Sequence, residues 1–592
     1  MKEHEKKVLE VLIKNNFGFK KSLYDIQINF IRDAINVINS KSFCIFSSPT
    51  GSGKTLSLLS TCIYFIDKTT DDLLDLFSGS IKTTIYYCSR THSQLNQVME
   101  QLKTNKDLYK SVILGSRKIY CKNKEVNRHG SDIEEINKKC KEARNKEKCS
   151  YYLNHHYQIQ NATTEELIKS KNMFCPYYYA KNRAPECEIV MLPYNLVFTE
   201  EGRNHQKIDL DDKILIVDES HNICDIVIDL NTSEIKISDI KRILHYKGLP
   251  KKIKDIIKKI DFFISKNALA VEKKYIYVDN FLEKTGLDKF NMFEVSDLLF
   301  SGKCIKSYND LSVFEFGKFL KLLNYSDEYG LVVYDSNFMR FTPVKPDLYF
   351  KKLKKCRSVI FASGTVDKCE LSEIFPDIKF FDYYFGSKNV LPLIIQKGIN
   401  KENLLIDKTN KTLLLPVILK SLVTLCDSVD NGGIVVFFQS KEFLNQVFKS
   451  PLMKCFGKKV FTEEEFFEYK KNPQILFGVM GGKLSEGIDF TNDLCRLLIV
   501  VGVPFPTKTI EFTERCKHSK EYGIITAMKK VNQTTGRAIR HKDDYAAIVL
   551  LDFRFTQFSK YLSEWVREKI ESVSVFQGYE KIKTFLCDNR HM

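Results

Sequence analysis

Short apolar runs that end at polar or glycine-rich residues recur along the chain and form two sets. The first set comprises residues 43–46, 83–87, 214–217 and 358–361, and the second comprises residues 433–438, 475–479, 497–501 and 546–551. Continuous apolar strands of this kind are typical of parallel sheets that are covered on both faces. The pattern therefore predicts an α/β fold with two units, each built on a parallel sheet.

Two stretches fit neither sheet. Residues 105–182 are rich in Lys and Arg and contain four spaced cysteines, whereas residues 236–344 show helical periodicity. The clearest helical run there has lysines between Ile253, Ile256, Ile257, Ile260 and Ile264. The predicted division is 1–104, 183–235 and 345–385 for the first α/β unit, 105–182 and 236–344 for its two insertions, and 386–592 for the second unit.

The composition adds a class of partner. Lys and Arg number 91 and Asp and Glu number 74, which leaves a formal net charge of +17. This surplus favours a polyanionic partner but does not by itself identify nucleic acid. A chain of 592 residues also exceeds a single hydrophobic core, in agreement with several units.

Nothing in the sequence predicts a membrane protein. Residues 1–7 are charged and lack the apolar core of a signal peptide, and no uncharged apolar stretch approaches about 18 residues. The 17 cysteines, without an export signal, indicate a reducing compartment in which thiols stay free or bind metal.

The first chemical motif is the loop Ser48-Pro-Thr-Gly-Ser-Gly-Lys-Thr55, which follows an apolar run. Glycines let backbone N–H groups close around phosphate, the lysine reaches the outer phosphates, and the threonine hydroxyl binds Mg²⁺. Leu56, Leu59 and Ile63 predict the amphipathic helix that this motif requires. The loop therefore predicts phosphate binding, with a chance glycine turn as the alternative.

Two acidic residues, Asp218 and Glu219, directly follow the run 214–217. Carboxylates at the end of a buried strand suit a ligand of Mg²⁺ and a base that orients the attacking water. The alternative is a pair of helix-capping acids, which the phosphate loop upstream disfavours.

A third motif, Gln533-Thr-Thr-Gly-Arg-Ala-Ile-Arg540, belongs to the second unit. Its spacing predicts that Gln533, Arg537 and Arg540 share one face of a helix. Guanidinium groups there can neutralise charge on a γ-phosphoryl group in transfer, so we expect ATP to sit between the two α/β units. Solvated surface arginines are the alternative.

The four cysteines of the first insertion are Cys121, Cys140, Cys149 and Cys175, with 18, 8 and 25 residues between them. They lack the Cys-x-x-Cys spacing of common structural zinc sites. The spacing alone leaves both metal binding and unliganded core thiols open. The adjacent tyrosines 177–179 either stack on bases or pack around the cysteines.

Together these motifs resemble those of superfamily 2 DEAH-type helicases, in the same order. The series is Tyr24-Asp-Ile-Gln27, the loop at 48–55, Ser89-Arg-Thr-His-Ser-Gln94, Asp218-Glu-Ser-His221, Ser363-Gly-Thr365, Gly481-Gly-Lys-Leu-Ser-Glu-Gly-Ile-Asp-Phe490 and the motif at 533–540. With the cysteine insertion, the chain resembles the XPD family of iron–sulphur DNA helicases. The stretches 114–117, 501–506 and 536–541 resemble its chromosome-loss (sister-chromatid cohesion) branch.

The resemblance implies roles for the residues of the ATP site. Gln27 would contact adenine, and Glu219 would be the base. Gln533 would face the γ-phosphate or its water, with Arg537 and Arg540 as arginine fingers. The phosphates would be held by Ser48, Pro49, Thr50, Gly51, Ser52, Gly53, Lys54 and Thr55, and Mg²⁺ by Thr55 and Asp218.

The resemblance further implies two RecA-like P-loop motor domains, an iron–sulphur domain and an arch-like helical domain. A 4Fe–4S cluster would be bound by Cys121, Cys140, Cys149 and Cys175. Cys175 is the fourth ligand because in the family this ligand precedes Pro-Tyr, as Cys175 does here. Cys187 does not fit that position. Contact with the DNA backbone, or its coupling to ATP, would fall to Arg90, Gly481, Gly482, Lys483, Ser485, Glu486 and Asp489.

The implied activity is ATP-dependent 5′→3′ translocation on single-stranded DNA, with unwinding of forked DNA by a monomeric motor. By resemblance, the location is the nucleus and the setting is replication, repair and sister-chromatid cohesion, with fork and cohesion proteins as partners. An ATPase that remodels protein–DNA complexes and a chromatin-binding scaffold are the alternatives. The chain departs from the family at Ser220, where Ala is usual, and at Ser47, where Glu is common.

Overall fold

The computed structural model describes most of the chain, with gaps. The described residues are 23–48, 51–71, 84–103, 109–128, 133–153, 159, 161–246, 248–267, 272–301, 311–364, 368–383, 389–482, 484–485, 490, 492–539 and 544–590. Among them, none of the helices combines the length and the apolar composition that crossing a membrane requires.

The first sheet has seven strands in the order β11-β1-β10-β5-β2-β4-β3, and all of its pairs are parallel. Its strands are β1 (Phe43–Ser47), β2 (Ile85–Ser89), β3 (Ser111–Ile113), β4 (Ile189–Pro193), β5 (Ile214–Asp218), β10 (Ser358–Ser363) and β11 (Lys379–Asp382). The four apolar runs of the first set correspond to β1, β2, β5 and β10.

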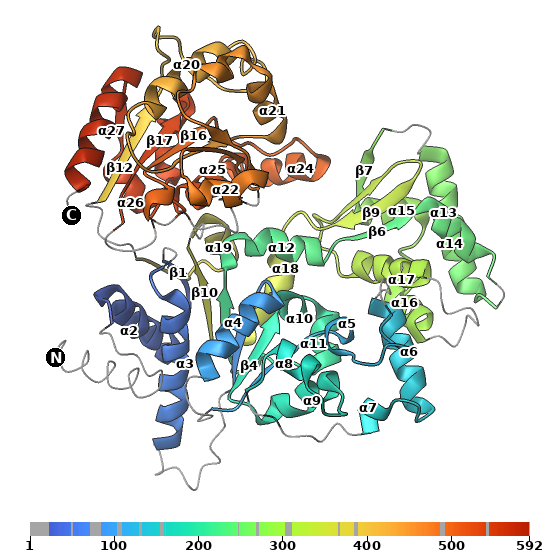
Figure 1. Cartoon of the computed structure of the whole chain (residues 1–592). Coiled ribbons are helices and arrows are strands. Elements are labelled where there is room, and N and C mark those ends of the chain that lie inside the picture. Colours follow the sequence, from blue (N-terminus) through green and yellow to red (C-terminus); the bar gives the residue numbers. More distant parts are fainter. Residues whose placement is uncertain are drawn as a thin grey trace.

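Helices cover both faces of this sheet (Figure 1). On one face lie α2 (Asp25–Asn39), α3 (Lys54–Asp71) and α4 (His92–Lys103). On the other lie α10 (Tyr194–Phe198), α12 (Ile223–Leu230), α18 (Asp347–Phe350) and α19 (Lys368–Ile374), with α11 (Glu200–Gln206) following α10. Along β1, Cys44 and Phe46 enter one core and Ile45 enters the other, as side-chain alternation in a strand requires.

The second sheet also has seven strands and is parallel throughout, in the order β14-β15-β13-β16-β17-β12-β18. Its strands are β12 (Val390–Ile395), β13 (Ile434–Phe438), β14 (Val460–Phe461), β15 (Ile475–Val479), β16 (Leu497–Val501), β17 (Ala546–Leu551) and β18 (Glu571–Val573). The main helices are α20 (Leu415–Cys426), α21 (Lys441–Lys449), α22 (Phe466–Lys471), α24 (Ile510–His518), α25 (Tyr522–Thr535), α26 (Glu564–Arg567) and α27 (Val575–Asn589). The prediction of two α/β units with parallel sheets is confirmed.

The predicted cysteine insertion, residues 105–182, includes β3 of the first sheet, and its four cysteines lie between β3 and β4. Its helices are α5 (Arg117–Tyr120), α6 (Ile133–Asn145), α7 (Ser150–Leu153), α8 (Thr164–Lys169) and α9 (Pro176–Arg183). Buried Tyr120, Ile136 and Phe174 belong to the same hydrophobic cluster as strands β2, β4 and β5. The insertion is therefore packed onto the first α/β unit.

The arch insertion, residues 236–344, contains helices and a sheet. Its helices are α13 (Ile237–Leu244), α14 (Lys251–Asn267), α15 (Val278–Thr285), α16 (Met292–Ser301) and α17 (Leu311–Asn324). The predicted isoleucine face of α14 is buried. A four-stranded antiparallel sheet, missed by the sequence analysis, is formed by β6 (Ser233–Lys236), β9 (Phe338–Thr342), β8 (Leu331–Tyr334) and β7 (Lys274–Tyr277) in that order.

Helix α24 of the second unit reaches towards the arch (Figure 1), where Tyr277 donates a hydrogen bond to Glu514 at 2.7 Å. The second unit also contacts the first, because Arg515 pairs with Asp225 at 2.9 Å. A second ion pair joins Lys529 on α25 to a glutamate on α19 at 2.6 Å. Polar pairs therefore connect the second unit both to the first and to the arch.

Candidate ATP site and cysteine cluster

The phosphate loop connects β1 to α3, as the motif requires. Gly51 and Gly53 have φ values of 83° and 80°, a left-handed conformation that glycine adopts without strain. A Cβ atom added at Gly53 would lie only 2.0 Å from Nε2 of Gln27, so a larger residue there would displace the Gln27 amide. Pro49 and Thr50 lie outside the described residues.

The side chain of Gln27 is held against this loop. Gln27 is buried on α2, and its Oε1 accepts a hydrogen bond from the backbone N–H of Tyr24 at 3.0 Å. Inside the loop, the hydroxyls of buried Ser48 and Ser52 are 2.7 Å apart. The structure therefore brings the predicted adenine contact and the predicted phosphate loop together.

Lys54 lies in the first turn of α3 and faces the two predicted carboxylates. Its Nζ is 2.9 Å from Oε1 of Glu219 and 3.7 Å from Oδ1 of Asp218. Burial alone would lower the pKa of Lys54, but the two carboxylates outweigh burial and raise it. Burial would likewise raise the pKa of Glu219, but Lys54 and the neighbouring His221 hold it well below its usual range. Burial raises the pKa of Asp218 despite Lys54.

Two buried tyrosines hold Asp218 and were missed by the sequence analysis. The hydroxyl of Tyr87, on β2, donates to Oδ2 of Asp218 at 2.7 Å, and that of Tyr194 donates to the Asp218 carbonyl. Burial raises the pKa of both hydroxyls, so they remain donors. The only sequence signal was a tyrosine within the apolar run 83–87.

The Asp218-Glu219-Ser220-His221 segment is bonded to the end of β10. Glu219 adopts a left-handed φ of 58°, and His221 Nδ1 lies 3.3 Å from Glu219 Oε2 and 3.1 Å from the Ser363 hydroxyl. Ser220 is buried, and its hydroxyl donates to the carbonyl of Ala362 at 3.2 Å. The serine that replaces the usual alanine is thus accommodated without an unsatisfied hydroxyl.

The second-unit motif differs from the prediction of one continuous helix. α25 ends at Thr535 with Gly536 as its C-cap, so Arg537 lies beyond the helix and does not share a helical face with Gln533. Instead, Nε of Arg537 donates to the carbonyl of Ser485 at 2.9 Å, which connects two of the predicted motifs. Outside the described residues lie Arg540, Lys483, Glu486 and Asp489.

Of the other predicted DNA or coupling residues, Arg90 is exposed directly after β2. Gly481 has a left-handed φ of 75°, and Gly482 follows it after β15. Thr55 is half-buried in the first turn of α3. These positions lie at or just beyond the carboxyl ends of parallel strands, where such sheets bind ligands.

The four predicted cysteine ligands all lie in the cysteine insertion, near enough to one another to interact electrostatically. Cys121 follows α5, Cys140 lies on α6, Cys149 precedes α7 and Cys175 is the N-cap of α9. Burial raises the pKa of Cys121 to about 12 and that of Cys175 to about 11, and neighbouring thiols of the same four raise both further. All four thiols are free of disulfides.

The spacing of these thiols does not suit a single ion. Four thiolates on one tetrahedral Zn²⁺ are about 3.8 Å apart, because each Zn–S bond is about 2.3 Å. In the described part of the chain, no group of three or more His, Cys, Asp or Glu side chains converges closely enough to hold one metal ion.

The tyrosines beside Cys175 pack rather than expose their rings. Tyr177, Tyr178 and Tyr179 are all buried. The guanidinium of Arg117 lies 4.2 Å from the centroid of the Tyr177 ring, and Arg144 lies 4.9 Å from that of Tyr178. The packing alternative therefore holds for these rings in this structure.

Two family profiles match the chain. The one described as DEAD_2 covers residues 87–240, and the one described as Helicase C-terminal domain covers residues 422–569. The first match includes the Asp218-Glu219 segment and the cysteine insertion, and the second includes most of the second α/β unit.

Solved structures support the same fold. A structure titled XPD_Helicase has a TM-score of 0.59 at 19% identity, and covers 94% of this chain and 100% of that one. A structure of S. tokodaii Xpd4 has a TM-score of 0.54 at 16% identity, over 93% of this chain and 100% of that one. The expected XPD-like arrangement of two RecA-like domains is confirmed.

Curated relatives match over most of the chain. ATP-dependent DNA helicase CHL1 of Vanderwaltozyma polyspora is 30% identical, over 82% of this chain and 72% of the relative. ATP-dependent DNA helicase chl1 of Schizosaccharomyces pombe is 28% identical, over 85% of this chain and 75% of the relative. ATP-dependent DNA helicase DDX11 of Mus musculus is 26% identical, over 89% of this chain and 76% of the relative. With the XPD-like fold, these matches show that the chain belongs to the CHL1/DDX11 family of XPD-like helicases.

Proposed function

We propose that this chain is an ATP-dependent DNA helicase that translocates 5′→3′ on single-stranded DNA and separates forked duplexes. The observation that carries the proposal is the contact of Lys54 with Glu219 and Asp218, at 2.9 and 3.7 Å, beside a left-handed glycine loop. Family membership supplies DNA as the substrate. The intact set of Lys54, Asp218, Glu219 and Arg537 disfavours a scaffold with a degenerate site.

The chain's own residues suggest how ATP would be held. Lys54 neutralises the two carboxylates in this ligand-free arrangement, and phosphate oxygens would replace them as its partners. Asp218 and Thr55 would then be available to Mg²⁺, which supplies charge neutralisation of the phosphates when bound. Glu219 would lose Lys54 as its partner and, with His221 Nδ1 3.3 Å from its Oε2, would be free to accept a proton or orient water.

The second unit would complete the site from the opposite side. Gln533 and Arg537 lie at the end of α25, the helix that also pairs with α19 of the first unit through Lys529. Arg540 is proposed as a further cation at the γ-phosphate. ATP between the units would draw them together, and its hydrolysis would release them, which gives the motor its stroke.

We expect Tyr87→Phe to raise the Mg²⁺ concentration that nucleotide binding requires. Without the Tyr87 hydroxyl, Oδ2 of Asp218 loses its 2.7 Å donor and the carboxylate is no longer fixed in orientation. Loss of such an outer partner commonly costs about 10- to 100-fold in metal affinity. The measurement is the Mg²⁺ concentration at half-maximal binding of a fluorescent ATP analogue, with binding in EDTA as the reference.

Tyr86→Phe is the matched control, because Tyr86 is the preceding buried tyrosine of β2 and lies in the other core. It should bind the analogue with the wild-type Mg²⁺ requirement. If Tyr87→Phe weakens binding of the analogue equally with Mg²⁺ and in EDTA, the result would contradict a role at the carboxylate and indicate a structural role instead.

We propose that the four cysteines bind a 4Fe–4S cluster. Cys140, Cys149 and Cys175 are buried; burial raises the pKa of Cys140, and the cationic side chains of Arg117 and Arg144 partly oppose that rise. Asn123 Nδ2 lies 3.7 Å from the Cys149 sulphur, a donor that would stabilise thiolate charge. The cluster would hold the insertion together as a wedge between separating strands.

The direct test of the proposed activity is ATP hydrolysis with and without single-stranded DNA. A helicase of this kind should hydrolyse ATP slowly alone and severalfold faster with DNA. If the rate of ATP hydrolysis is the same with and without single-stranded DNA, the proposal of a DNA-driven motor would be wrong. A nuclear location and partners at replication forks or in cohesion are proposed from the family alone.

A further inference from the structure

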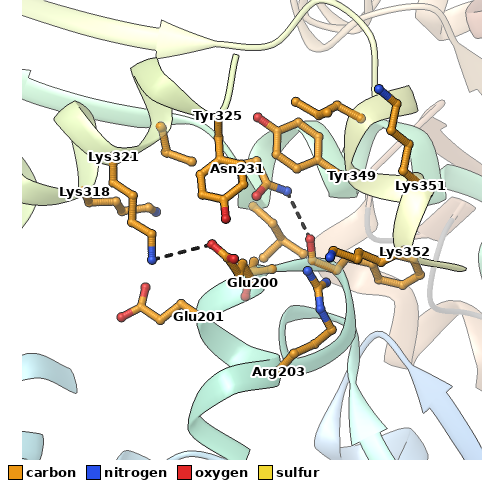
Figure 2. Close-up of a pocket in the computed structure, with 15 residues that line it drawn as sticks. Glu200, Glu201, Arg203, Asn231, Lys318, Lys321, Tyr325, Tyr349, Lys351 and Lys352 are labelled. Carbon is orange, nitrogen blue, oxygen red and sulfur yellow. Dashed lines mark hydrogen bonds and ion pairs between the residues drawn. The ribbon is translucent and has the colours of Figure 1, made fainter. Parts of the chain in front are cut away.

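A hollow of about 240 Å³ lies where the arch insertion meets the first α/β unit (Figure 2), and none of its lining residues belongs to the ATP loop or to the cysteine insertion. The arch supplies α17 and Tyr325 after it, and the first unit supplies α10, α11, the end of α12 and α18 with the turn after it. Drug-sized ligands occupy roughly 300–1,000 Å³. The hollow is smaller than that and suits one or two anchoring side chains of a docked peptide.

The walls of the hollow are mainly apolar. They are formed by Phe198, Leu230, Leu322, Leu348 and the ring of Tyr349. The Tyr349 hydroxyl is buried and has no hydrogen-bond partner among the described residues, and burial raises its pKa, so it stays a donor.

The rim carries a surplus of positive charge. Lys318, Lys351 and Lys352 are exposed, and none of them forms an ion pair with a described residue. The remaining rim charges largely cancel: Lys321 lies 3.7 Å from Glu200 (Figure 2), and Arg203 offsets Glu201. Three unpaired lysines around an apolar hollow call for an anionic occupant with an apolar centre.

Two anionic macromolecules fit the rim, and the lining favours one of them. A nucleic-acid strand needs a cationic track with exposed aromatic faces for stacking. Here the carboxylates of Glu200 and Glu201 lie in the same lining, Tyr325 is hydrogen-bonded to Glu200, and the apolar surface is enclosed rather than displayed. An acidic peptide can direct its carboxylates to the outer lysines and only its apolar residue inward.

We propose that this hollow is a docking site for an acidic peptide segment of a partner protein, with an aromatic or leucine side chain as its anchor. The peptide carboxylates pair with Lys318 on the arch and with Lys351 and Lys352 on the first unit. One bound segment therefore contacts both bodies and holds the arch against the first unit. The proposal does not depend on the helicase activity proposed above.

The test is selection of random short peptides displayed on phage against the whole chain, followed by fluorescence anisotropy of a selected peptide. The enriched peptides should carry net negative charge around an aromatic or leucine residue. The double variant Lys318→Glu/Lys351→Glu should bind the peptide at least about tenfold more weakly, because it reverses two of the rim charges.

Lys258→Glu/Lys354→Glu is the matched control, with the same charge change at one exposed arch lysine and one exposed lysine beside the hollow but outside its lining. It should bind within about twofold of wild type, since rim charges outside a contact contribute little. Enrichment of neutral or basic peptides, the absence of enrichment, or equal losses in both variants would overturn the proposal. The proposal would also be overturned if poly-dT displaced the peptide and its own binding depended equally on Lys318 and Lys351. That result would assign the hollow to nucleic acid.

Discussion

Lys54→Ala should lower DNA-stimulated ATP hydrolysis by about 100-fold or more and abolish unwinding. Lys54 is the cation that faces Glu219 and Asp218 inside the phosphate loop, and no other described lysine or arginine forms an ion pair with either carboxylate. Loss of one group that stabilises charge in the transition state costs about 10²–10³-fold in rate. The measurement is steady-state phosphate release with saturating single-stranded DNA and Mg²⁺.

Lys379→Ala provides the control for that substitution. Lys379 is exposed on β11 and pairs in register with Cys44 near the start of β1, away from the loop that follows the end of this strand. This variant should retain wild-type turnover. Retention of more than about a tenth of the activity by Lys54→Ala, folded as wild type by circular dichroism, would contradict the assigned role of Lys54.

Cys149→Ser should remove the brown absorbance of the protein and most of its unwinding, while much of the ATPase survives. Cys149 is buried beside Asn123 and interacts with the other three cysteines, so its loss should release the cluster. The ATP site is formed by the loop between β1 and α3 and by the carboxylates at the end of β5, and these elements lie outside the cysteine insertion. Iron content, absorbance and unwinding rate are measured together, and the loss of unwinding should exceed about tenfold.

Cys187→Ser is the matched control, since Cys187 is a buried cysteine close to the same insertion and outside the proposed ligand set. It should retain iron and unwinding. If Cys149→Ser keeps its iron, Cys149 is not a ligand. If it loses iron and still unwinds at the wild-type rate, the wedge role of the insertion is wrong.

Much of the fold could be predicted because buried parallel strands have sequences that are uninterrupted apolar runs. The run at 358–361 covers the first four residues of β10 and the run at 546–551 covers all of β17, and both strands are buried at every residue. The edge strand β11 was missed because its sequence, Lys-Phe-Phe-Asp, is polar at both ends, and β3 has only three residues. Short strands at sheet edges leave little periodic signal.

The arch sheet was missed for a different reason. Its strands β6 and β9 are separated by about a hundred residues in sequence, so their pairing depends on long-range contacts. The adjacent strands β8 and β9 form a local hairpin, whose short apolar runs the sequence analysis overlooked. Lys-rich helices such as α14 dominate the intervening stretch and gave the prediction of a mainly helical insertion.

The candidate site could be predicted as far as its motifs, and no further. Lys54, Asp218 and Glu219 were identified because a phosphate loop and strand-end carboxylates have fixed sequence forms. The role of Tyr87 was hidden, because a hydroxyl that ends at Asp218 is indistinguishable in sequence from a core tyrosine. The predicted continuous helix through Gln533 and Arg537 was wrong: α25 ends at Thr535, and its C-cap Gly536 has a right-handed φ of −63° instead of the left-handed conformation of a glycine stop.

Unwinding of forked DNA with a single-stranded tail of one polarity tests the central claim most directly. The protein, purified under protection from air, is given ATP, Mg²⁺ and forks that carry either a 5′ tail or a 3′ tail. The account predicts unwinding of the 5′-tailed fork that requires ATP and is absent on the 3′-tailed fork. Equal unwinding of both forks, or DNA-stimulated ATP hydrolysis without unwinding of either, would contradict a 5′→3′ helicase.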